Sequence, residues 1–259
     1  MDQRKPIIKV RNMTARYGGN LVLDSLTFDV FPGEVFIILG GSGCGKSTLL
    51  KHMIGLYHPA EGEIFIAGDD IVVAQGDTRQ RIVRKFGVMY QSGALFGSMT
   101  LLENTRLPIE LYTNLPKEAI DIIATLKLKL VGLDAYVNHY PAEISGGMKK
   151  RAAIARAMAM DPEILFLDEP SAGLDPITSA DIDQLILLLA KSLNVTFVVV
   201  THELPSIFAI ADRVIMLDKR VKKIVATGDP RDLRDHSDNS WVRQFFNRKA
   251  ETAGSYTSS

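Results

Sequence analysis

The chain has 259 residues, 46% of them hydrophobic and 23% charged, and its 30 basic and 30 acidic side chains give a formal net charge of +0. This length suits one large α/β domain with a helical insertion, and it leaves ample material for a core. The balanced charge gives no electrostatic reason to expect nucleic acid as a partner, and the one cysteine, Cys44, excludes an internal disulfide bond and fits a reducing compartment.

The sequence predicts neither a secretory signal nor a membrane-spanning segment. Residues 1–6 are polar and lead directly into a strand pattern, so we expect a cytoplasmic protein. The longest apolar runs, such as Leu185–Ala190 and Phe197–Val200, are far shorter than the ~20 residues that cross a bilayer. Any membrane role is therefore expected to come through a partner.

The first elements predict an antiparallel hairpin. Residues 7–13 and 22–30 alternate apolar and polar side chains around a turn at Tyr17–Asn20. An aromatic side chain at this place could stack on an adenine ring, or it could simply anchor the turn.

Residues 40–47 fit the phosphate-loop pattern of a glycine, four free positions and then Gly-Lys-Ser. They lie between a buried-strand pattern at Val35–Leu39 and a helix pattern at Thr48–Ile54. The glycines allow a tight turn whose N–H groups face phosphate oxygens, and the helix N-terminus adds partial positive charge. We expect Lys46 to reach the β- and γ-phosphates and Ser47 to ligate Mg²⁺. The predicted phosphate-binding residues are Gly40, Gly41, Ser42, Gly43, Cys44, Gly45, Lys46, Ser47 and Thr48.

Cys44 occupies a free position of this loop. A small filler residue is the first interpretation, and a reactive thiol is the alternative.

Two further strands are predicted at Gly62–Gly68 and Phe86–Gln91, and the basic stretch Arg79–Lys85 between them is expected to be solvated. Gln91 ends its strand, at the edge where ligands bind in open α/β sheets. Its amide could therefore face the γ-phosphate and the metal ion, although surface glutamines are common.

A helical insertion is predicted from residue 92 to about residue 141. Leu101–Glu110 and Lys117–Gly132 have helical spacing. The insertion ends at Ser145–Gly147, where Ser145 is a natural N-cap for a helix running through Ala152–Met160. This helix start, flanked by basic side chains, could hold a second phosphate, or it could be an ordinary capped helix.

Three polar side chains follow the next two strand patterns. Pro162–Pro170 is apolar up to Asp168 and Glu169, and burying two adjacent acids for packing alone is costly. We expect Asp168 to hold Mg²⁺ through water and Glu169 to polarise the attacking water. After a helix at Thr178–Ser192 and a parallel strand at 195–200, His202 could donate to the γ-phosphate or be a structural histidine.

The C-terminal part predicts two strands, at 214–217 and 222–227, and then a helical segment. Residues 229–249 carry Trp241, Val242, Phe245 and Phe246 at helical spacing. This segment could close the core or form an interaction surface for another subunit. Residues 250–259 are expected to be a disordered tail.

These motifs, in this order, resemble the ATP-binding subunit of ABC transporters over nearly the whole chain. The resemblance implies an α/β fold, a P-loop NTPase of the ABC ATPase type with a RecA-like core sheet, an antiparallel β subdomain and a helical insertion. It implies that 1–249 form the ATP-binding domain, with the core and β subdomain in 1–91 and 160–228, the helical subdomain in 92–159 and a C-terminal helical segment in 229–249.

The same resemblance implies a role for each motif, and no motif residue is replaced by an inactive one. It assigns adenine stacking to Tyr17, the Walker A loop to Gly40–Ser47, the Q-loop to Gln91, the signature motif to Ser145, Gly146 and Gly147, Walker B to Ile164–Asp168, the catalytic glutamate to Glu169, the D-loop to Asp175 and the switch histidine to His202. We therefore expect turnover of ATP, and not a regulatory module that only binds nucleotide.

One departure from the usual Leu-Ser-Gly-Gly-Gln signature is informative. The chain has Ile144–Met148 followed by Lys149–Ala153, which looks like the ATPases paired with MCE-domain lipid transporters, the Mla type that moves phospholipid across the Gram-negative envelope. Gln91–Phe96 and Val242–Phe246 also resemble segments of that family.

The resemblance further implies a head-to-tail dimer around two ATP molecules, with Mg²⁺. Each γ-phosphate would meet Lys46, Gln91 and His202 of one subunit and Ser145 and Gly147 of the other. The implied partners are a second copy, an integral-membrane permease, an MCE-domain protein and, as an option, a small regulatory subunit, at the cytoplasmic face of the inner membrane. Two nearby apolar side chains, Phe96 and Met99, would contact the permease or pack the insertion on the core.

Two rival functions share this chemistry. Soluble ABC ATPases of translation or DNA repair usually carry tandem cassettes or a long coiled-coil insertion, and the chain has neither. An importer or exporter cassette for another solute is the other rival, against which the signature methionine Met148 argues.

Overall fold

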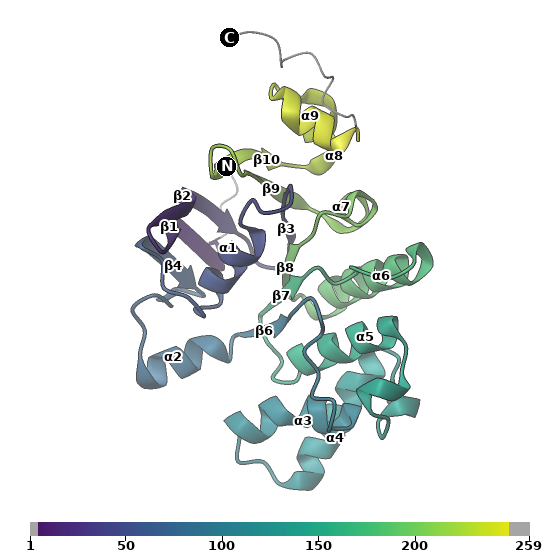
Figure 1. Ribbon diagram of the computed structural model, residues 1–259. Helices are drawn as coiled ribbons and strands as arrows, with labels where there is room; N and C mark the ends of the chain where they lie inside the picture. Colours follow the sequence, from purple (N-terminus) through teal and green to yellow (C-terminus); the bar gives the residue numbers. More distant parts are fainter. Residues whose placement is uncertain (1–4, 249–259) are drawn as a thin grey trace.

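The computed structural model describes residues 5–248, which build two β-sheets and a separate group of helices (Figure 1). The larger sheet has the strand order β10-β9-β3-β8-β7-β6. Its strands are β3 (Val35–Gly40), β6 (Phe86–Met89), β7 (Ile164–Asp168), β8 (Thr196–Val200), β9 (Arg213–Asp218) and β10 (Lys223–Gly228). Neighbouring strands are parallel except for the β9–β10 pair. The carboxyl ends of β3, β6, β7 and β8 therefore lie at one edge, where open α/β sheets bind ligands.

The smaller sheet is antiparallel, in the order β2-β1-β4-β5. It consists of β1 (Ile8–Tyr17), β2 (Asn20–Val30), β4 (Glu61–Ile66) and β5 (Asp69–Asp70). Tyr17 pairs with Asn20, and the two glycines between them have φ angles of +52° and +84°. The predicted hairpin is confirmed, since glycine accepts the left-handed backbone that this tight turn requires.

Both faces of the large sheet are buried, which explains why its strands appear as continuous apolar runs in the sequence. Phe36 and Ile38 of β3 pack on one side, in a core shared with the smaller sheet and α1 (Lys46–Met53). Ile37 and Leu39 pack on the other side, against the helices α5 (Gly146–Ala157), α6 (Pro176–Leu193) and α7 (Leu204–Ile210). These two cores fix the edge of the sheet on which the site is built.

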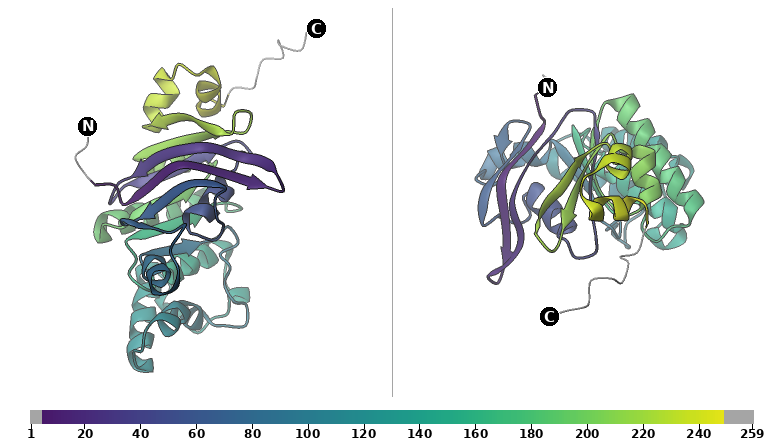
Figure 2. Two further views of the ribbon diagram at one scale, coloured as in Figure 1. Left: turned by 90° about the vertical axis from the view of Figure 1, so that its left-hand side faces the viewer. Right: turned by 90° about the horizontal axis from the view of Figure 1, so that it is seen from above.

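The predicted helical insertion forms the end of the molecule farthest from the C-terminal helices (Figures 1 and 2). It contains α3 (Leu101–Tyr112), α4 (Lys117–Leu130) and α5, with short 3-10 helices at Asp134–Tyr136 and Pro141–Glu143. Thr100 caps α3 by accepting a bond from the Glu103 N–H, and the Glu103 carboxylate accepts one from the Thr100 N–H. Ser145 caps α5, as predicted, but α5 ends at Ala157.

Arg79–Lys85 is not a merely solvated stretch, so that prediction was wrong. Most of it belongs to α2 (Gly76–Val83), whose Ile82 is fully buried while Arg79 donates hydrogen bonds to the backbone carbonyls of Gly55 and Ile71. A helix with a single buried side chain gives little apolar periodicity, which is why the basic side chains dominated its pattern.

The C-terminal segment forms two short helices, α8 (Pro230–His236) and α9 (Ser240–Phe246), beyond β10 (Figure 2). Val242 and Phe246 are buried in the same core as α7, so the core-closing interpretation is the one that the structure supports. Residue 249 and the predicted tail at 250–259 lie outside the described residues. Between residues 5 and 248, no helix is long and apolar enough to cross a membrane.

Candidate active site

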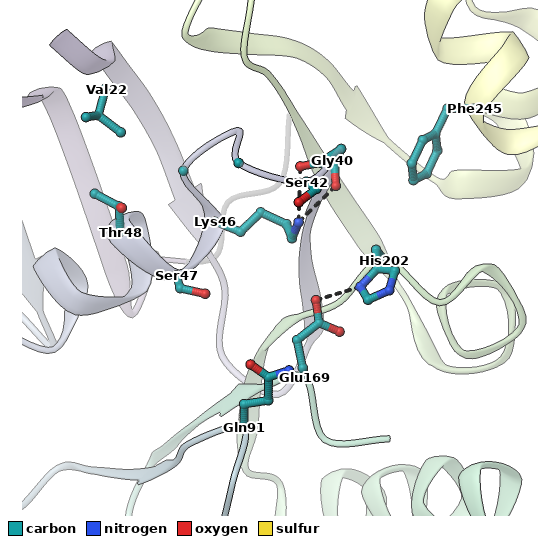
Figure 3. A pocket seen from close by; sticks show the side chains of 13 residues that line it. Val22, Gly40, Ser42, Lys46, Ser47, Thr48, Gln91, Glu169, His202 and Phe245 are labelled. Carbon is teal, nitrogen blue, oxygen red and sulfur yellow. Dashed lines mark hydrogen bonds and ion pairs between the residues drawn. The ribbon is translucent and has the colours of Figure 1, made fainter. Parts of the chain in front are cut away.

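A pocket of about 550 Å³ opens at the carboxyl edge of the large sheet (Figure 3). It is lined by Val22, Gly40, Gly41, Ser42, Gly43, Gly45, Lys46, Ser47, Thr48, Gln91, Glu169, His202 and Phe245. The lining therefore combines the predicted phosphate loop with residues that follow three different strands, and it adds one aromatic side chain from α9.

The phosphate loop needs its glycines for physical reasons that the structure makes visible. Gly40 has a φ of +147°, and a Cβ there would lie 2.5 Å from the Leu217 carbonyl oxygen and 2.6 Å from Cys44 Sγ. Gly45, with a φ of +100°, precedes α1, which has no side-chain cap and no acidic residue in its first turn. The positive end of α1 is thus presented to the pocket, ready for an anion.

Lys46 places its ammonium group over the same loop. Its Nζ donates to the carbonyl oxygens of Gly40 at 2.9 Å and Gly41 at 3.4 Å. Charged donors bond more strongly to ionised acceptors than to neutral ones, so a phosphate would draw this side chain into the pocket. Cys44 is only 2% exposed, and burial raises the pKa of its thiol, which favours the filler interpretation over a reactive thiolate.

Ser47 and Asp168 form the part of the site that fits a divalent cation. The Ser47 hydroxyl lies 3.2 Å from Asp168 Oδ1. Burial raises the pKa of Asp168, while the bond from Ser47 lowers it. Hard oxygen ligands of this kind suit Mg²⁺, which commonly takes its remaining ligands from phosphates and water. Within residues 5–248, no cluster of three or more His, Cys, Asp or Glu side chains could hold a metal ion.

Glu169 is held in an uncommon backbone conformation with a φ of +50°. Its carboxylate Oε1 lies 2.8 Å from Nδ1 of His202, and since a carboxylate oxygen only accepts, Nδ1 is the donor. Its Oε2 is buried and has no hydrogen-bond partner among the described residues. A buried acceptor without a partner is costly, so strain and an open acceptor together mark this side chain as functional.

Three residues of this region were not identified from the sequence as site residues. One is Val22 of β2, which lines the pocket beside the phosphate loop. Phe245 lines the pocket from α9, on the side of Ser42 and His202 (Figure 3). Lys150 of α5 is only 7% exposed, and its Nζ donates to the carbonyl oxygens of Gln91 and Glu169. Burial lowers the pKa of Lys150, and the carboxylates of Glu169 and Asp168 oppose that shift.

A helical pattern could have singled out Lys150. It lies three residues after Gly147 and four before Ile154, and both of these are buried. A lysine on the buried face of a helix needs polar partners inside the protein.

Several predicted site residues lie outside this pocket. The Tyr17 ring packs edge-on against Tyr57, with ring centroids 5.8 Å apart, so its adenine contact stays a prediction. Ser145 caps α5 by accepting a bond from the Met148 N–H, and Asp175 caps α6 by accepting bonds from the N–H groups of Ile177 and Thr178. None of Ser145, Gly146, Gly147 and Asp175 is among the described residues that line the pocket.

A protein-family model described as "ABC transporter" matches residues 23–172 of this chain. The chain is 41% identical over 249 residues to the "Probable ribonucleotide transport ATP-binding protein mkl" of Mycobacterium leprae, covering 95% of this chain and 71% of that protein. It is 38% identical to the "Intermembrane phospholipid transport system ATP-binding protein MlaF" of Haemophilus influenzae, with coverage of 90% and 87%. For the MlaF of Escherichia coli K12, the identity is 36%, with coverage of 95% and 90%.

Solved structures give the same picture. The ATP-binding cassette MJ0796, in a dimeric post-hydrolysis state bound to ADP and Pi, superposes with a TM-score of 0.77 at 32% identity, covering 86% of this chain and 98% of that one. The cbiO1 protein of Clostridium perfringens, part of the ABC transporter complex cbiONQ, gives a TM-score of 0.82 at 28% identity, with coverage of 90% and 92%.

Proposed function

The chain belongs to the ABC transporter family as an ATP-hydrolysing subunit, and from this premise we propose that it drives the movement of phospholipids between two membranes. The observation that supports phospholipid as the cargo is the sequence identity of 36–38% over 87–90% of the MlaF chains. The signature segment Ile144–Met148 and the segment Gln91–Phe96, which pointed to the same subfamily, support it.

Transport of ribonucleotides is the second candidate. Its support is the identity of 41% to the mycobacterial mkl protein, of which this chain spans 71%. The phospholipid proposal is preferred because the chain matches MlaF over nearly the full length of both proteins.

For the reaction, we propose that the phosphate loop holds the nucleotide and that Glu169 acts on water. The N–H groups of residues 40–48 and the Lys46 ammonium bind the phosphates. Glu169 Oε2, which has no protein partner among the described residues, accepts a hydrogen bond from the attacking water. His202 holds Glu169 through Oε1 and faces the γ-phosphate together with Gln91. Ser47 and Asp168, with Gln91, would hold Mg²⁺, which when bound neutralises charge that develops on the phosphates.

We propose that a second copy of the chain completes each site. Ser145 caps α5 and Asp175 caps α6, and Gly146 and Gly147 form the first turn of α5, all outside the pocket of their own chain. Ser145, Gly146 and Asp175 are not buried, so this helix start is available to a neighbouring copy. The dimeric state of the similar cassette MJ0796 supports this arrangement. ATP between two copies would bring the start of α5 of one chain to the phosphate of the other.

The remaining partners follow from the proposed transport. We propose an integral-membrane permease, an MCE-domain protein and an optional small regulatory subunit, with the chain held peripherally at the cytoplasmic face of the inner membrane. Tyr17 is proposed to contact the adenine. We also propose that residues 1–249 act as one ATP-binding domain, with the boundaries given above.

The test is a pull-down from detergent-solubilised membranes of the source cells. Glu169→Gln is the bait in ATP, because it should bind nucleotide without hydrolysing it and keep the complex closed. Lys46→Ala, which should not bind ATP, is the matched control bait. We expect a permease, an MCE-domain protein and phospholipid to co-purify with Glu169→Gln and not with Lys46→Ala.

Two other results would point elsewhere. If the recovered permease binds labelled ribonucleotide and carries no phospholipid, the cargo is ribonucleotide, as in the second candidate function. Recovery of ribosomes or DNA-repair proteins without a permease would contradict the transport proposal and leave the ATPase.

A further inference from the structure

Lys150 is a buried cation that joins the helical insertion to the catalytic edge of the sheet. It lies on the second turn of α5, five residues after the N-cap Ser145. Its Nζ donates to the carbonyl oxygen of Gln91, which follows β6, and at 3.2 Å to that of Glu169, which follows β7. One ammonium group thus holds two strand ends and one helix together.

This connection resists sliding for an electrostatic reason. A buried ammonium that loses its acceptors retains the cost of desolvation, so a movement of α5 away from β6 and β7 is expensive. The Asp168 and Glu169 carboxylates also stabilise the positive charge of Lys150. The lowest-cost movement therefore carries Gln91, Glu169 and the start of α5 together.

The start of α5 is also fixed on its other side. A Cβ on Gly147 would lie 2.4 Å from Cγ2 of Thr178, which is in the first turn of α6. Gly147 therefore packs with its backbone directly against α6, the helix that Asp175 caps. Ser145 and Gly146 are exposed at the end of this fixed helix.

In the proposed dimer, the α5 start of one chain meets the ATP of the other, whereas Glu169 acts on the ATP of its own chain. We propose that Lys150 is a positioning residue that couples the two ATP sites, because it ties the signature residues presented to one ATP to the catalytic glutamate at the other. This inference rests on the proposed dimer and deepens it. Binding at one site would then shift Gln91 and Glu169 at the other.

The experiment compares Lys150→Met with Lys149→Met, the neighbouring lysine on the same helix. Initial rates of ATP hydrolysis are measured over a range of ATP concentrations, and ATP binding is measured separately in the absence of turnover. Wild type and Lys149→Met are expected to show a Hill coefficient above one. Lys150→Met is expected to show a Hill coefficient of about one and a kcat lower by about tenfold, with unchanged ATP affinity, because coupling free energies commonly correspond to about 5–150-fold.

Lys150→Arg keeps a charged donor and is expected to restore most of the cooperativity. Lys150→Gln serves as the second variant, because its amide can donate to one carbonyl without a buried charge, and thermal melts confirm that each variant is folded. A Hill coefficient above one in folded Lys150→Met or Lys150→Gln, equal to that of wild type, overturns the inference, as does wild-type hydrolysis without cooperativity.

The proposed dimer is tested apart from this coupling. Size-exclusion chromatography of Glu169→Gln in ATP reports dimer formation directly. Absence of a dimer overturns both proposals, whereas a dimer with unaltered cooperativity in Lys150→Met overturns the coupling alone.

Discussion

Two helix starts in this molecule are suited to phosphate, and they differ in how much of a site each chain builds around them. The start of α1 lies in a pocket with Lys46, Glu169 and His202, at strand ends held between two hydrophobic cores. The start of α5 is capped by Ser145, which is exposed together with Gly146, and residues 145–147 do not line the pocket of their own chain. The comparison teaches that one chain assembles the residues proposed for hydrolysis in a single pocket, whereas the helical insertion leaves the start of α5 exposed, where the proposed second copy would use it.

The largest effect is expected from Lys46→Ala, which removes the cation of the α1 site. ATP binding should weaken by at least about a hundredfold, because charge-assisted bonds to phosphate are lost, and hydrolysis should disappear. Equilibrium binding of labelled ATP measures the loss. Lys117→Ala, on the exposed start of α4, is the control that should bind normally. If Lys46→Ala keeps its affinity for ATP, the start of α1 is not the phosphate site.

Glu169→Gln should separate binding from chemistry within the α1 site. The amide keeps the size of the side chain but is a much weaker acceptor for the attacking water, so kcat should fall by about 10²–10⁴-fold while ATP affinity holds. Steady-state hydrolysis and nucleotide binding are measured on the same preparation. A kcat within a factor of a few of wild type would show that another group acts on the water.

Gly147→Ala should act at the start of α5 without changing the residues of the α1 site. The added methyl group would meet Thr178 Cγ2 at 2.4 Å, so the start of α5 must shift. Hydrolysis is expected to fall by about tenfold, with ATP binding to the single chain unchanged. Thr178→Ser in the same chain removes the clashing methyl group, keeps the hydroxyl that bonds Asp175 and leaves the nearest Thr178 atom 3.9 Å away. If this double variant does not recover the hydrolysis rate of wild type, the contact between Gly147 and Thr178 is not the cause of the loss.

The smallest effect on hydrolysis is expected from Asp183→Asn, in the α6 helix between the two regions. Asp183 is 5% exposed, its Oδ1 has no partner in the described part of the chain, and burial raises its pKa to about 6 although a bond from Ser206 lowers it. The folded state therefore prefers the protonated form. The protonated Asp183 side chain contributes fully to stability at pH values below the pKa of Asp183 in the unfolded chain. This contribution is lost as the pH rises to about 6.

Asp183→Asn should accordingly raise the free energy of unfolding at pH 7.5, by at most about 3 kcal/mol, with little gain near pH 4. Thermal melts across this pH range measure the difference. Asp181→Asn is the control, since Asp181 is 57% exposed and pairs with Arg151 at 3.7 Å. If the increase in the free energy of unfolding in Asp183→Asn does not depend on pH, the buried charge is not its cause.

The elements that were predicted well from the sequence are those in which successive side chains are all buried or alternate regularly between core and solvent. The strands β3, β7 and β8 are buried on both faces, so their interior positions are apolar, and their ends are marked by a glycine loop, by two acids and by His202. The hairpin β1–β2 was equally plain because its turn needs two glycines. The order of these signals was enough to indicate the ABC fold and the α1 site.

The features that were missed depend on contacts between distant segments. The helix α2 buries one isoleucine and therefore lacks a periodic signal. Lys150 belongs to a basic triplet that was interpreted as flanking a phosphate site, and its bonds to the backbone of Gln91 and Glu169 join segments that are far apart in the sequence. The aromatic residues of α9 had helical spacing, but their distance in sequence from the phosphate loop hid the contact of Phe245 with the pocket.

That contact has an optical consequence. Trp241 is the one tryptophan of the chain, and its ring lies 6.3 Å from that of Phe245 and 5.1 Å below the guanidinium group of Arg220. A nucleotide in the pocket would contact Phe245 and thereby change the surroundings of a single indole. The protein's own ultraviolet emission should therefore report when a nucleotide enters and leaves, with no dye attached and no background from a second tryptophan.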